Sequence, residues 1–331
     1  TPETPDAETP ETAQADVSAD REQFLADVLA GLGRRPKQLH CKYLYDERGS
    51  RLFDEITRLP EYYLTDAEQA IMDAHAAEMA EQIGPGAMLI EFGSGSSTKT
   101  RALLDHLDSP AAYVPLDVSE EHLLKTAARL REAYPDLEIL PLVADFTRPF
   151  ELPRATRPPS HAAVYFPGST IGNFSPAEVH TMLVRIRRIL GPQGGLLIGI
   201  DLRKDPETIE AAYNDSRQVT DEFISNLLRR ANRELGADFD LDRFSLEAVY
   251  DEELGRVELS MVSDTDQTVT IADRRFDFAE GERVRIEYSH KYTIEGFARM
   301  AQEAGFSLHR HWTDPDDMFA VLHLVNEGGQ P

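Results

Sequence analysis

One segment of the sequence has the residue types and spacing of a site for a nucleotide-type ligand. An apolar run at residues 87–92, interrupted only by Glu91, leads into a turn that contains Gly93 and Gly95. Two glycines allow the backbone to turn sharply and to approach a ligand closely, and the helix expected beyond them favours an anion at its N-terminus. Asp117 follows on the next predicted strand, where its carboxylate could accept hydrogen bonds from both hydroxyls of a ribose.

This turn departs from the nicotinamide-binding pattern, because Thr98 stands where that pattern has a third glycine to pack the helix against the strand. A Glu-x-Gly-x-Gly turn with two later acids at strand ends resembles instead the cofactor side of S-adenosylmethionine-dependent methyltransferases. In that family the glycine loop holds the methionine part, the first acid the ribose and the second acid the adenine amine. The resemblance therefore places S-adenosylmethionine against Glu91, Gly93, Ser94, Gly95, Asp117, Asp145 and Phe146. A nicotinamide-dependent oxidoreductase stays as the rival enzyme, since it would use the same strand, turn and first acid.

Residues 65–203 alternate between predicted helices and predicted strands. Apolar runs indicate buried strands at residues 87–92, 113–116, 137–143, 162–166 and 195–202. Helices are expected from residue 65, from residue 96, over 122–130 and from Pro176, where Ser175 and Glu178 have capping-box spacing. Strands joined by helices of this length require right-handed crossovers and a mostly parallel sheet that is covered on both faces. The pattern predicts an α/β fold with a doubly wound, Rossmann-like sheet.

The pattern changes after Pro206. A long helix is expected from there through Tyr213 to Leu235, and alternating runs at 257–262, 269–271 and 284–292 indicate a half-exposed antiparallel sheet. A helix over 293–304 and two strands, 306–312 and 318–325, then complete the first sheet. The segment between therefore reads as an inserted α+β unit, and the residues before 65 are expected to pack with it.

Three parts follow from this division. Residues 1–16, rich in Pro, Thr and acids, are expected to form a disordered leader. Residues 17–64 and 204–291 are expected to form an α+β substrate-binding domain. Residues 65–203 and 292–331 are expected to form the Rossmann-like domain, which the cofactor resemblance makes a class I methyltransferase sheet.

Three further segments carry a more specific resemblance. They are FDEITRLPEYY at 53–63, GSTIGN at 168–173 and EYS at 287–289. Together with the glycine turn they resemble the bacterial histidine-specific Nα-methyltransferases of ergothioneine biosynthesis, from about Phe24 to Val325. The resemblance implies trimethylation of the α-amine of L-histidine to its betaine, hercynine.

The same resemblance implies a role for each matching residue, in a site between the two domains. Asn173 and Tyr213 would hold the substrate carboxylate, and Tyr62 would lie near the α-amine. Tyr62 and Asn173 would also orient the amine and help to pass its proton out. Glu287 and Ser289 would hold the imidazole ring, whose N–H an ionised carboxylate can accept.

One position leaves the substrate open. An apolar residue that faces the ring in the family falls near Leu259, with Met261 two places on. An apolar pocket discriminates by only about 1 to 3 kcal/mol per methylene, so tryptophan or tyrosine is an alternative substrate. A module that binds an amino acid without turnover is the alternative outside the enzymes.

Composition limits the partners and the compartment. The formal net charge of −25 repels nucleic acid and anionic lipid at long range, and no apolar run approaches the length of a membrane span. Cys41 is the only cysteine, so no internal disulfide can form, and a monomer in the reducing cytoplasm is expected. His309 and His311 alternate along one predicted strand and lack a clear third ligand, so no metal site is expected.

Overall fold

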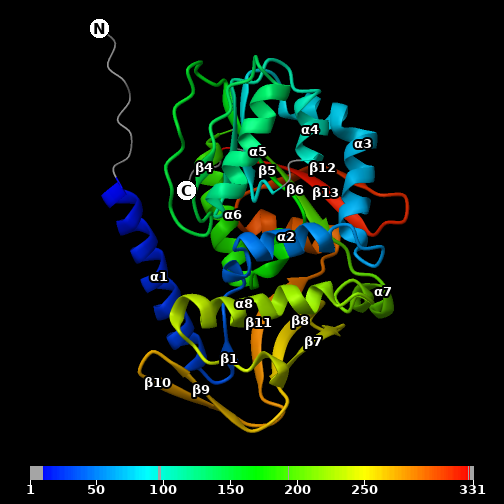
Figure 1. Ribbon diagram of the computed structural model, residues 1–331. Coiled ribbons are helices and arrows are strands. Elements are labelled where there is room, and N and C mark those ends of the chain that lie inside the picture. Colours follow the sequence, from blue (N-terminus) through cyan, green and yellow to red (C-terminus); the bar gives the residue numbers. More distant parts are fainter. Residues whose placement is uncertain (1–9, 96–97, 193, 327, 329–331) are drawn as a thin grey trace. The chain divides into compact units, whose positions relative to one another are not determined.

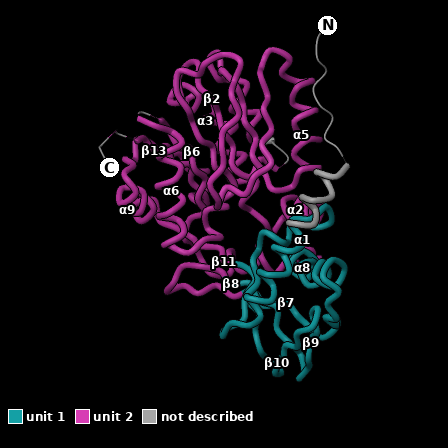
Figure 2. The backbone as a smooth tube through the Cα atoms, turned by 90° about the vertical axis from the view of Figure 1, so that its left-hand side faces the viewer, with its two compact units in different colours: residues 1–49, 220–248, 258–287 teal, residues 50–219, 249–257, 288–331 magenta. Residues whose placement is uncertain are grey.

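The computed structural model describes residues 10–95, 98–192, 194–326 and 328. The chain divides into two compact units, one of residues 1–49, 220–248 and 258–287 and the other of residues 50–219, 249–257 and 288–331 (Figure 2). Residues 50–64 and 204–219, which the sequence analysis placed in the substrate-binding domain, belong to the second unit. The functional division into domains stays a prediction.

A seven-stranded sheet forms the centre of the second unit (Figure 1). Its order is β12-β13-β6-β5-β2-β3-β4. The strands are β2 (Ala87–Phe92), β3 (Ala112–Asp117), β4 (Leu142–Val143), β5 (His161–Phe166), β6 (Gly195–Asp201), β12 (Ser307–Thr313) and β13 (Phe319–Val325). The five adjacent strands β6, β5, β2, β3 and β4 are parallel to one another. Strand β13 runs antiparallel to both of its neighbours, β12 and β6. The expected terminal hairpin therefore does complete the first sheet.

Strand order reverses between β2 and β5, which are adjacent although β3 and β4 lie between them in the chain. In open α/β sheets a reversal of this kind leaves a crevice at the carboxyl ends of the strands, where ligands bind. The glycine turn follows β2 and the GSTIGN segment follows β5. The topology therefore brings these two segments to the same end of adjacent strands.

Helices cover both faces of this sheet. They are α3 (Tyr63–Ile83), α4 (Thr98–Leu104), α5 (Glu120–Ala133), α6 (Pro176–Leu190) and α9 (Ile294–Glu303). Ile90 joins the apolar core made with α6 and α9, while its neighbour Glu91 bonds Thr100 on α4. Successive side chains of a strand point to opposite faces, so this pair shows that each face has its own helical layer. The predicted doubly wound sheet is confirmed.

Local signals placed several of these helices correctly. Ser175 accepts from the backbone N–H of Glu178, whose carboxylate accepts from the Ser175 N–H at 2.8 Å, and Pro176 is the first residue of α6. This is the predicted capping box. Helix α3 begins at Tyr63, two residues before the predicted start.

Two expected elements are shorter than the sequence pattern indicated. The strand expected over 137–143 pairs regularly only at Leu142–Val143, with one isolated bridge from Ile139, because Pro141 has no N–H to offer a ladder. The long helix after Pro206 is two helices, α7 (Pro206–Ala211) and α8 (Val219–Leu235). The carboxylate of Asp215 accepts the N–H of Val219 at 2.9 Å and starts the second helix. Tyr213 therefore lies in a link between helices, not on a helix.

The first unit combines helices with two small sheets. Its regular elements, including those that pass into the second unit, are α1 (Pro10–Leu32), β1 (Lys37–Gln38), η1 (Cys41–Leu44), α2 (Glu47–Ile56), most of α8, η3 (Leu241–Arg243), β7 (Phe244–Asp251), β8 (Arg256–Ser263), β9 (Gln267–Ile271), β10 (Arg274–Phe278) and β11 (Arg283–His290). The four-stranded sheet has the order β1-β11-β8-β7, and β9 and β10 form an antiparallel pair. On α8, the Asn226 amide donates to Asp46 at 2.8 Å and so fixes the segment that leads into α2.

The acidic leader is described only in part. Residues 1–9 lie outside the described residues, and residues 10–16 form the first turns of α1 instead of an irregular segment. A proline at the first helical position and the helix formers that follow it favour this start. Within the described ranges, no helix is both long and apolar enough to cross a bilayer.

Candidate active site

The glycine turn after β2 has a left-handed backbone at both glycines, in keeping with the sharp turn that the sequence predicted. Gly93 has φ +70° and Gly95 has φ +40°. The N–H groups of Gly93 and Ser94 donate to the carbonyl of Leu116 at 2.8 and 3.2 Å, which ties the turn to the end of β3. Among the described residues, no heavy atom lies within 4 Å of the position that a Cβ on Gly93 would take. The backbone conformation therefore favours glycine here, and the space beside Gly93 is open.

Glu91 supports this turn from within the sheet. Its side chain is buried, and its carboxylate accepts from the hydroxyl of Thr100 at 2.7 Å and from that of Tyr113. Burial raises the pKa of Glu91 to about 8 despite these hydrogen bonds. These hydrogen bonds hold the end of β2, from which the turn begins. A contact of Glu91 with the cofactor stays a prediction.

The two predicted acids lie at the ends of neighbouring strands. Asp117 ends β3, where its carboxylate accepts the N–H of Ser119 at 2.9 Å and a backbone hydrogen bond from Gly95. Burial raises the pKa of Asp117 in spite of these backbone donors. Asp145 lies two residues beyond β4, and its carboxylate accepts from the hydroxyl and the N–H of Thr147. Both acids thus lie at the carboxyl edge that carries the glycine turn.

Phe146 connects the cofactor side with the substrate side. Its ring stacks on Phe92 at 5.5 Å between centroids and meets the edge of Phe174 at 6.2 Å. Phe92 directly precedes Gly93, and Phe174 directly follows Asn173. The three rings therefore set the glycine turn and the GSTIGN segment next to each other.

The GSTIGN segment itself is a compact turn. Ser169 has φ 54°, and the 3₁₀ helix η2 (Thr170–Asn173) follows it. A Cβ on Gly172 would come within 2.8 Å of the carbonyl oxygen of His290, whose ring nitrogen Nδ1 lies 2.8 Å from the carbonyl oxygen of Gly172. Only glycine permits this close approach, which brings half-buried Asn173 to the residues that end β11.

Tyr213, Ser289 and Tyr62 also come together. The hydroxyl of Tyr213 lies 2.7 Å from Oγ of Ser289, and the ring of Tyr62 meets that of Tyr213 edge to face with 6.4 Å between centroids. Since Ser289 directly precedes His290, these side chains share one region with Gly172 and Asn173. Three of the five residues predicted to bind the substrate are thus in contact within the second unit, and Asn173 follows Gly172 on the segment that packs against His290.

The fifth residue, Glu287, is the last residue of the first unit. It lies two positions before Ser289 on β11, so the two side chains project from the same face of that strand. Leu259 and Met261 lie on β8 and are both fully buried, and they likewise share one face. That one of them faces the substrate ring stays a prediction.

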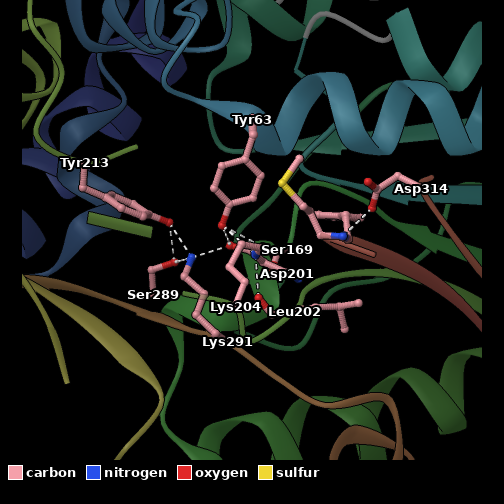
Figure 3. Close-up of polar contacts among 11 residues, drawn as sticks. Tyr63, Ser169, Asp201, Leu202, Lys204, Tyr213, Ser289, Lys291 and Asp314 are labelled. Atoms are coloured by element: carbon pink, nitrogen blue, oxygen red, sulfur yellow. Dashed lines mark hydrogen bonds and ion pairs between the residues drawn. The ribbon is translucent and has the colours of Figure 1, made fainter. Parts of the chain in front are cut away.

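A buried ionic network that was not predicted from the sequence lies next to these residues (Figure 3). The carboxylate of Asp201, at the end of β6, pairs with the ammonium groups of Lys204 and Lys291 at 2.6 Å each. It also accepts from the hydroxyl of Tyr63 at 2.9 Å, and the Asp201 N–H donates to the Ser169 hydroxyl at 2.9 Å. The side chains of Asp201 and Lys291 are fully buried.

This environment shifts two of the pKa values. Burial, with Asp201 close by, raises the pKa of the Tyr63 hydroxyl. Burial lowers the pKa of Lys204, although Asp201 opposes that effect. The location of Asp201 at the carboxyl end of a predicted strand was the one available sequence signal for this network. Lys291 gave no signal, because a lysine in a strand is ordinarily exposed.

A second buried carboxylate links the two loops directly. Glu68, on α3, forms an ion pair with Lys99 on α4 and accepts the N–H of Gly168 at 2.9 Å. Lys99 lies on the helix that follows the glycine turn, and Gly168 begins the GSTIGN segment. Glu68 therefore ties the start of the GSTIGN segment to the helix that follows the glycine turn. Among the described residues, no three His, Cys, Asp or Glu side chains gather in a metal-binding arrangement.

Comparisons with known proteins agree with this chemistry. The family model described as histidine-specific methyltransferase, SAM-dependent, matches residues 24–326. The histidine N-alpha-methyltransferase of Mycolicibacterium smegmatis is 39% identical over 310 residues, which cover 92% of this chain and 95% of that protein. Its namesake from Mycobacterium tuberculosis is 40% identical over 301 residues, covering 89% and 92%. Ergothioneine biosynthesis protein 1 of Neurospora crassa is 36% identical over 297 residues, covering 88% of this chain and 33% of that protein.

The match spans both units and includes every segment from which the resemblance was inferred. Together with the seven-stranded sheet order, it confirms the predicted class I methyltransferase fold. The chain belongs to the family of S-adenosylmethionine-dependent, histidine-specific methyltransferases.

Proposed function

We propose that this protein transfers three methyl groups in succession from S-adenosylmethionine to the α-amine of L-histidine. The product is the betaine hercynine, and the reaction is the first step of ergothioneine biosynthesis. The proposal is supported by the contacts of Tyr213 with Ser289 and Tyr62, in a chain of this family whose GSTIGN segment adjoins the glycine turn through Phe146. We further propose that the enzyme is a monomer.

The residues at the carboxyl ends of β2 to β4 fit the proposed cofactor. The open space beside Gly93 leaves room for the methionine part at the turn. Asp117 offers a carboxylate to the two ribose hydroxyls, and Asp145 offers one to the adenine amine. The ring of Phe146 is only partly buried and supplies an apolar surface beside them.

On the substrate side, each proposed contact matches the chemistry of an amino acid. The amide of Asn173 and the hydroxyl of Tyr213 are neutral donors suited to a carboxylate. Glu287 and the hydroxyl of Ser289 offer acceptors to the imidazole N–H. Tyr62 presents both a hydroxyl and an aromatic face, and its ring meets that of Phe53 at 6.4 Å. Such faces tolerate the soft cation that forms as methyl groups accumulate on the nitrogen.

Bound S-adenosylmethionine supplies a methyl group on a positively charged sulfur, and the carbon–sulfur electron pair stays on sulfur as the new carbon–nitrogen bond forms. The protein need only present a neutral amine in line with that methyl carbon. Alignment of this kind is worth up to about 7 to 11 kcal/mol of the barrier. Each transfer requires the loss of one proton from the nitrogen, and we expect Tyr62 and Asn173 to orient the amine and to help pass the proton to water.

The test is a turnover screen of the common amino acids with the purified full-length chain and S-adenosylmethionine. Mass spectrometry should detect monomethyl, dimethyl and trimethyl histidine, with three molecules of S-adenosylhomocysteine released per hercynine. Tryptophan and tyrosine belong in the same screen, because Leu259 and Met261 are both apolar and buried. If histidine stays unmodified at a saturating concentration of S-adenosylmethionine, the proposed function is refuted.

A further inference from the structure

Lys291 directs its charge at two of the proposed substrate-binding residues. Its ammonium group, with the side chain fully buried, donates to the hydroxyl of Tyr213 at 2.7 Å and to that of Ser289 at 2.9 Å, and pairs with Asp201 at 2.6 Å (Figure 3). An ammonium has three N–H donors, and these three acceptors match them. The geometry therefore fixes the ammonium between one carboxylate and two hydroxyls.

This arrangement constrains the hydroxyl hydrogens. The oxygens of Tyr213 and Ser289 both accept from Lys291, and they lie 2.7 Å apart, so one hydroxyl hydrogen lies between them. Two hydroxyl hydrogens are present, so at most one can point out of this triangle. A donor whose direction is set before the substrate arrives costs less to order on binding than a freely rotating one.

We propose that Lys291 is a positioning residue for the substrate. It holds the hydroxyls of Tyr213 and Ser289 in one orientation, so that a single charge organises the residues proposed for the carboxylate and for the ring. The inference rests on the proposed function, because it takes an amino acid as the ligand of those two hydroxyls. Lys291 acts through them, and no contact of its own with the substrate is required.

Asp201 keeps the ammonium in place. Its carboxylate is held by Tyr63 and Lys204 as well as by Lys291, and its N–H is fixed on the Ser169 hydroxyl. A buried ion pair is a weak source of stability, because removing two charges from water offsets most of their attraction. A pair that also fixes the direction of two hydroxyls has a role that apolar packing cannot supply.

The first experiment is Lys291→Met, which removes the charge and keeps a long unbranched side chain. Loss of a hydrogen bond from a charged donor predicts a KM for histidine raised about 10- to 100-fold. The KM for S-adenosylmethionine should stay within about twofold, and kcat should fall less than KM rises. The matched control is Lys125→Met, which removes an exposed lysine paired with Glu121 on α5 and should leave both KM values unchanged. An unchanged histidine KM in Lys291→Met would overturn the proposal.

A double-mutant cycle separates positioning from general support of the fold. Tyr213→Phe removes the hydroxyl through which Lys291 is proposed to act. The double variant with Lys291→Met should therefore lose much less than the product of the two single losses. Effects that multiply within about twofold would show that Lys291 does not act through Tyr213, and would overturn the inference.

A third variant covers the case in which Lys291→Met does not fold. Lys291→Gln retains two N–H donors without the charge, so it should raise the histidine KM above that of the wild type while binding S-adenosylhomocysteine normally. If Lys291→Gln has the same histidine KM as the wild type, the charge of Lys291 is not needed to position the two hydroxyls, and that part of the proposal is refuted.

Binding of histidine in the presence of S-adenosylhomocysteine, followed by calorimetry, separates this inference from the proposed function. Wild-type protein that binds histidine but never methylates it would refute the function. The effect of Lys291→Met on Kd would still decide the positioning role.

Discussion

Replacing Glu91 by glutamine should change how the stability of the fold depends on pH. Glu91 lies under the glycine turn with its carboxylate bonded to the hydroxyls of Thr100 and Tyr113, and burial raises its pKa from 4.5 to about 8. A group whose pKa is raised by folding stabilises the folded state fully below the unfolded value, here 4.5. That contribution is lost as the pH rises through the folded value of about 8.

The magnitude follows from the width of this window. Within it, the free energy of unfolding of the wild type should fall by about 1 kcal/mol per pH unit from Glu91 alone, or about 2 kcal/mol between about pH 6 and about pH 8. Glutamine has the shape of the protonated acid and the same kind of donor and acceptor, but it does not titrate. The free energy of unfolding of Glu91→Gln should therefore increase relative to that of the wild type as the pH rises.

Urea unfolding of both proteins across this range measures the effect, because the other titrating groups cancel in the difference. Glu121→Gln is the matched control. Its side chain is exposed and Lys125 lowers its pKa, so its difference from the wild type should be independent of pH in this window. If the free energies of unfolding of the wild type and Glu91→Gln change in parallel with pH, Glu91 is ionised throughout this range. The reasoning from burial would then be wrong.

Three further predictions concern the site. Glu287→Ala should lower kcat/KM for histidine more than for tryptophan in a competition assay, since a hydrogen bond to a charged acceptor is worth about 1.5 to 3 kcal/mol; equal losses would show that Glu287 does not read the ring. Phe146→Ala should destabilise the fold by about 2 to 3 kcal/mol and weaken binding of S-adenosylhomocysteine in calorimetry, because its ring stacks on Phe92; unchanged affinity would contradict the cofactor assignment. Gly172→Ala should raise the histidine KM at least about tenfold, since its Cβ would collide with the His290 carbonyl; a normal KM would show that this approach does not position Asn173.

Much of the fold could be predicted from local sequence signals. The continuous apolar run at residues 87–92 is β2, and the Ser175, Pro176 and Glu178 signals start α6 where expected. These predictions succeeded because a buried parallel strand and a capped helix have their causes within a few neighbouring residues.

The errors came where one residue overrules a longer pattern. Apolar residues at 137–143 favoured a strand, yet Pro141 removes a backbone donor and limits the ladder to Leu142–Val143. Helical periodicity after Pro206 hid the turn at Asn214, Asp215 and Ser216, whose side chains compete for backbone hydrogen bonds. That turn takes Tyr213 off the helix and brings it to Ser289.

The candidate site was predictable by residue type, and its internal support was not. Tyr62, Asn173 and Ser289 lie in short motifs and Tyr213 was assigned by the wider family resemblance, and the structure brings Tyr62 and Ser289 to Tyr213. The only local signal for Asp201 was its place at the carboxyl end of a predicted strand, and Lys291 had none. The register of β13 against β6 and the course of the chain beyond β11 bury both charges together.

The antiparallel place of β13 has a consequence for synthesis on the ribosome. The edge of β6 that ends at Asp201 is covered by β13, which is translated far later, after the whole inserted segment. Until β13 arrives, β6 presents an unpaired apolar edge of the kind that templates aggregation. Nascent chains stalled before residue 319 should therefore depend on chaperones, and the buried ions around Asp201 can assemble only when translation is nearly complete.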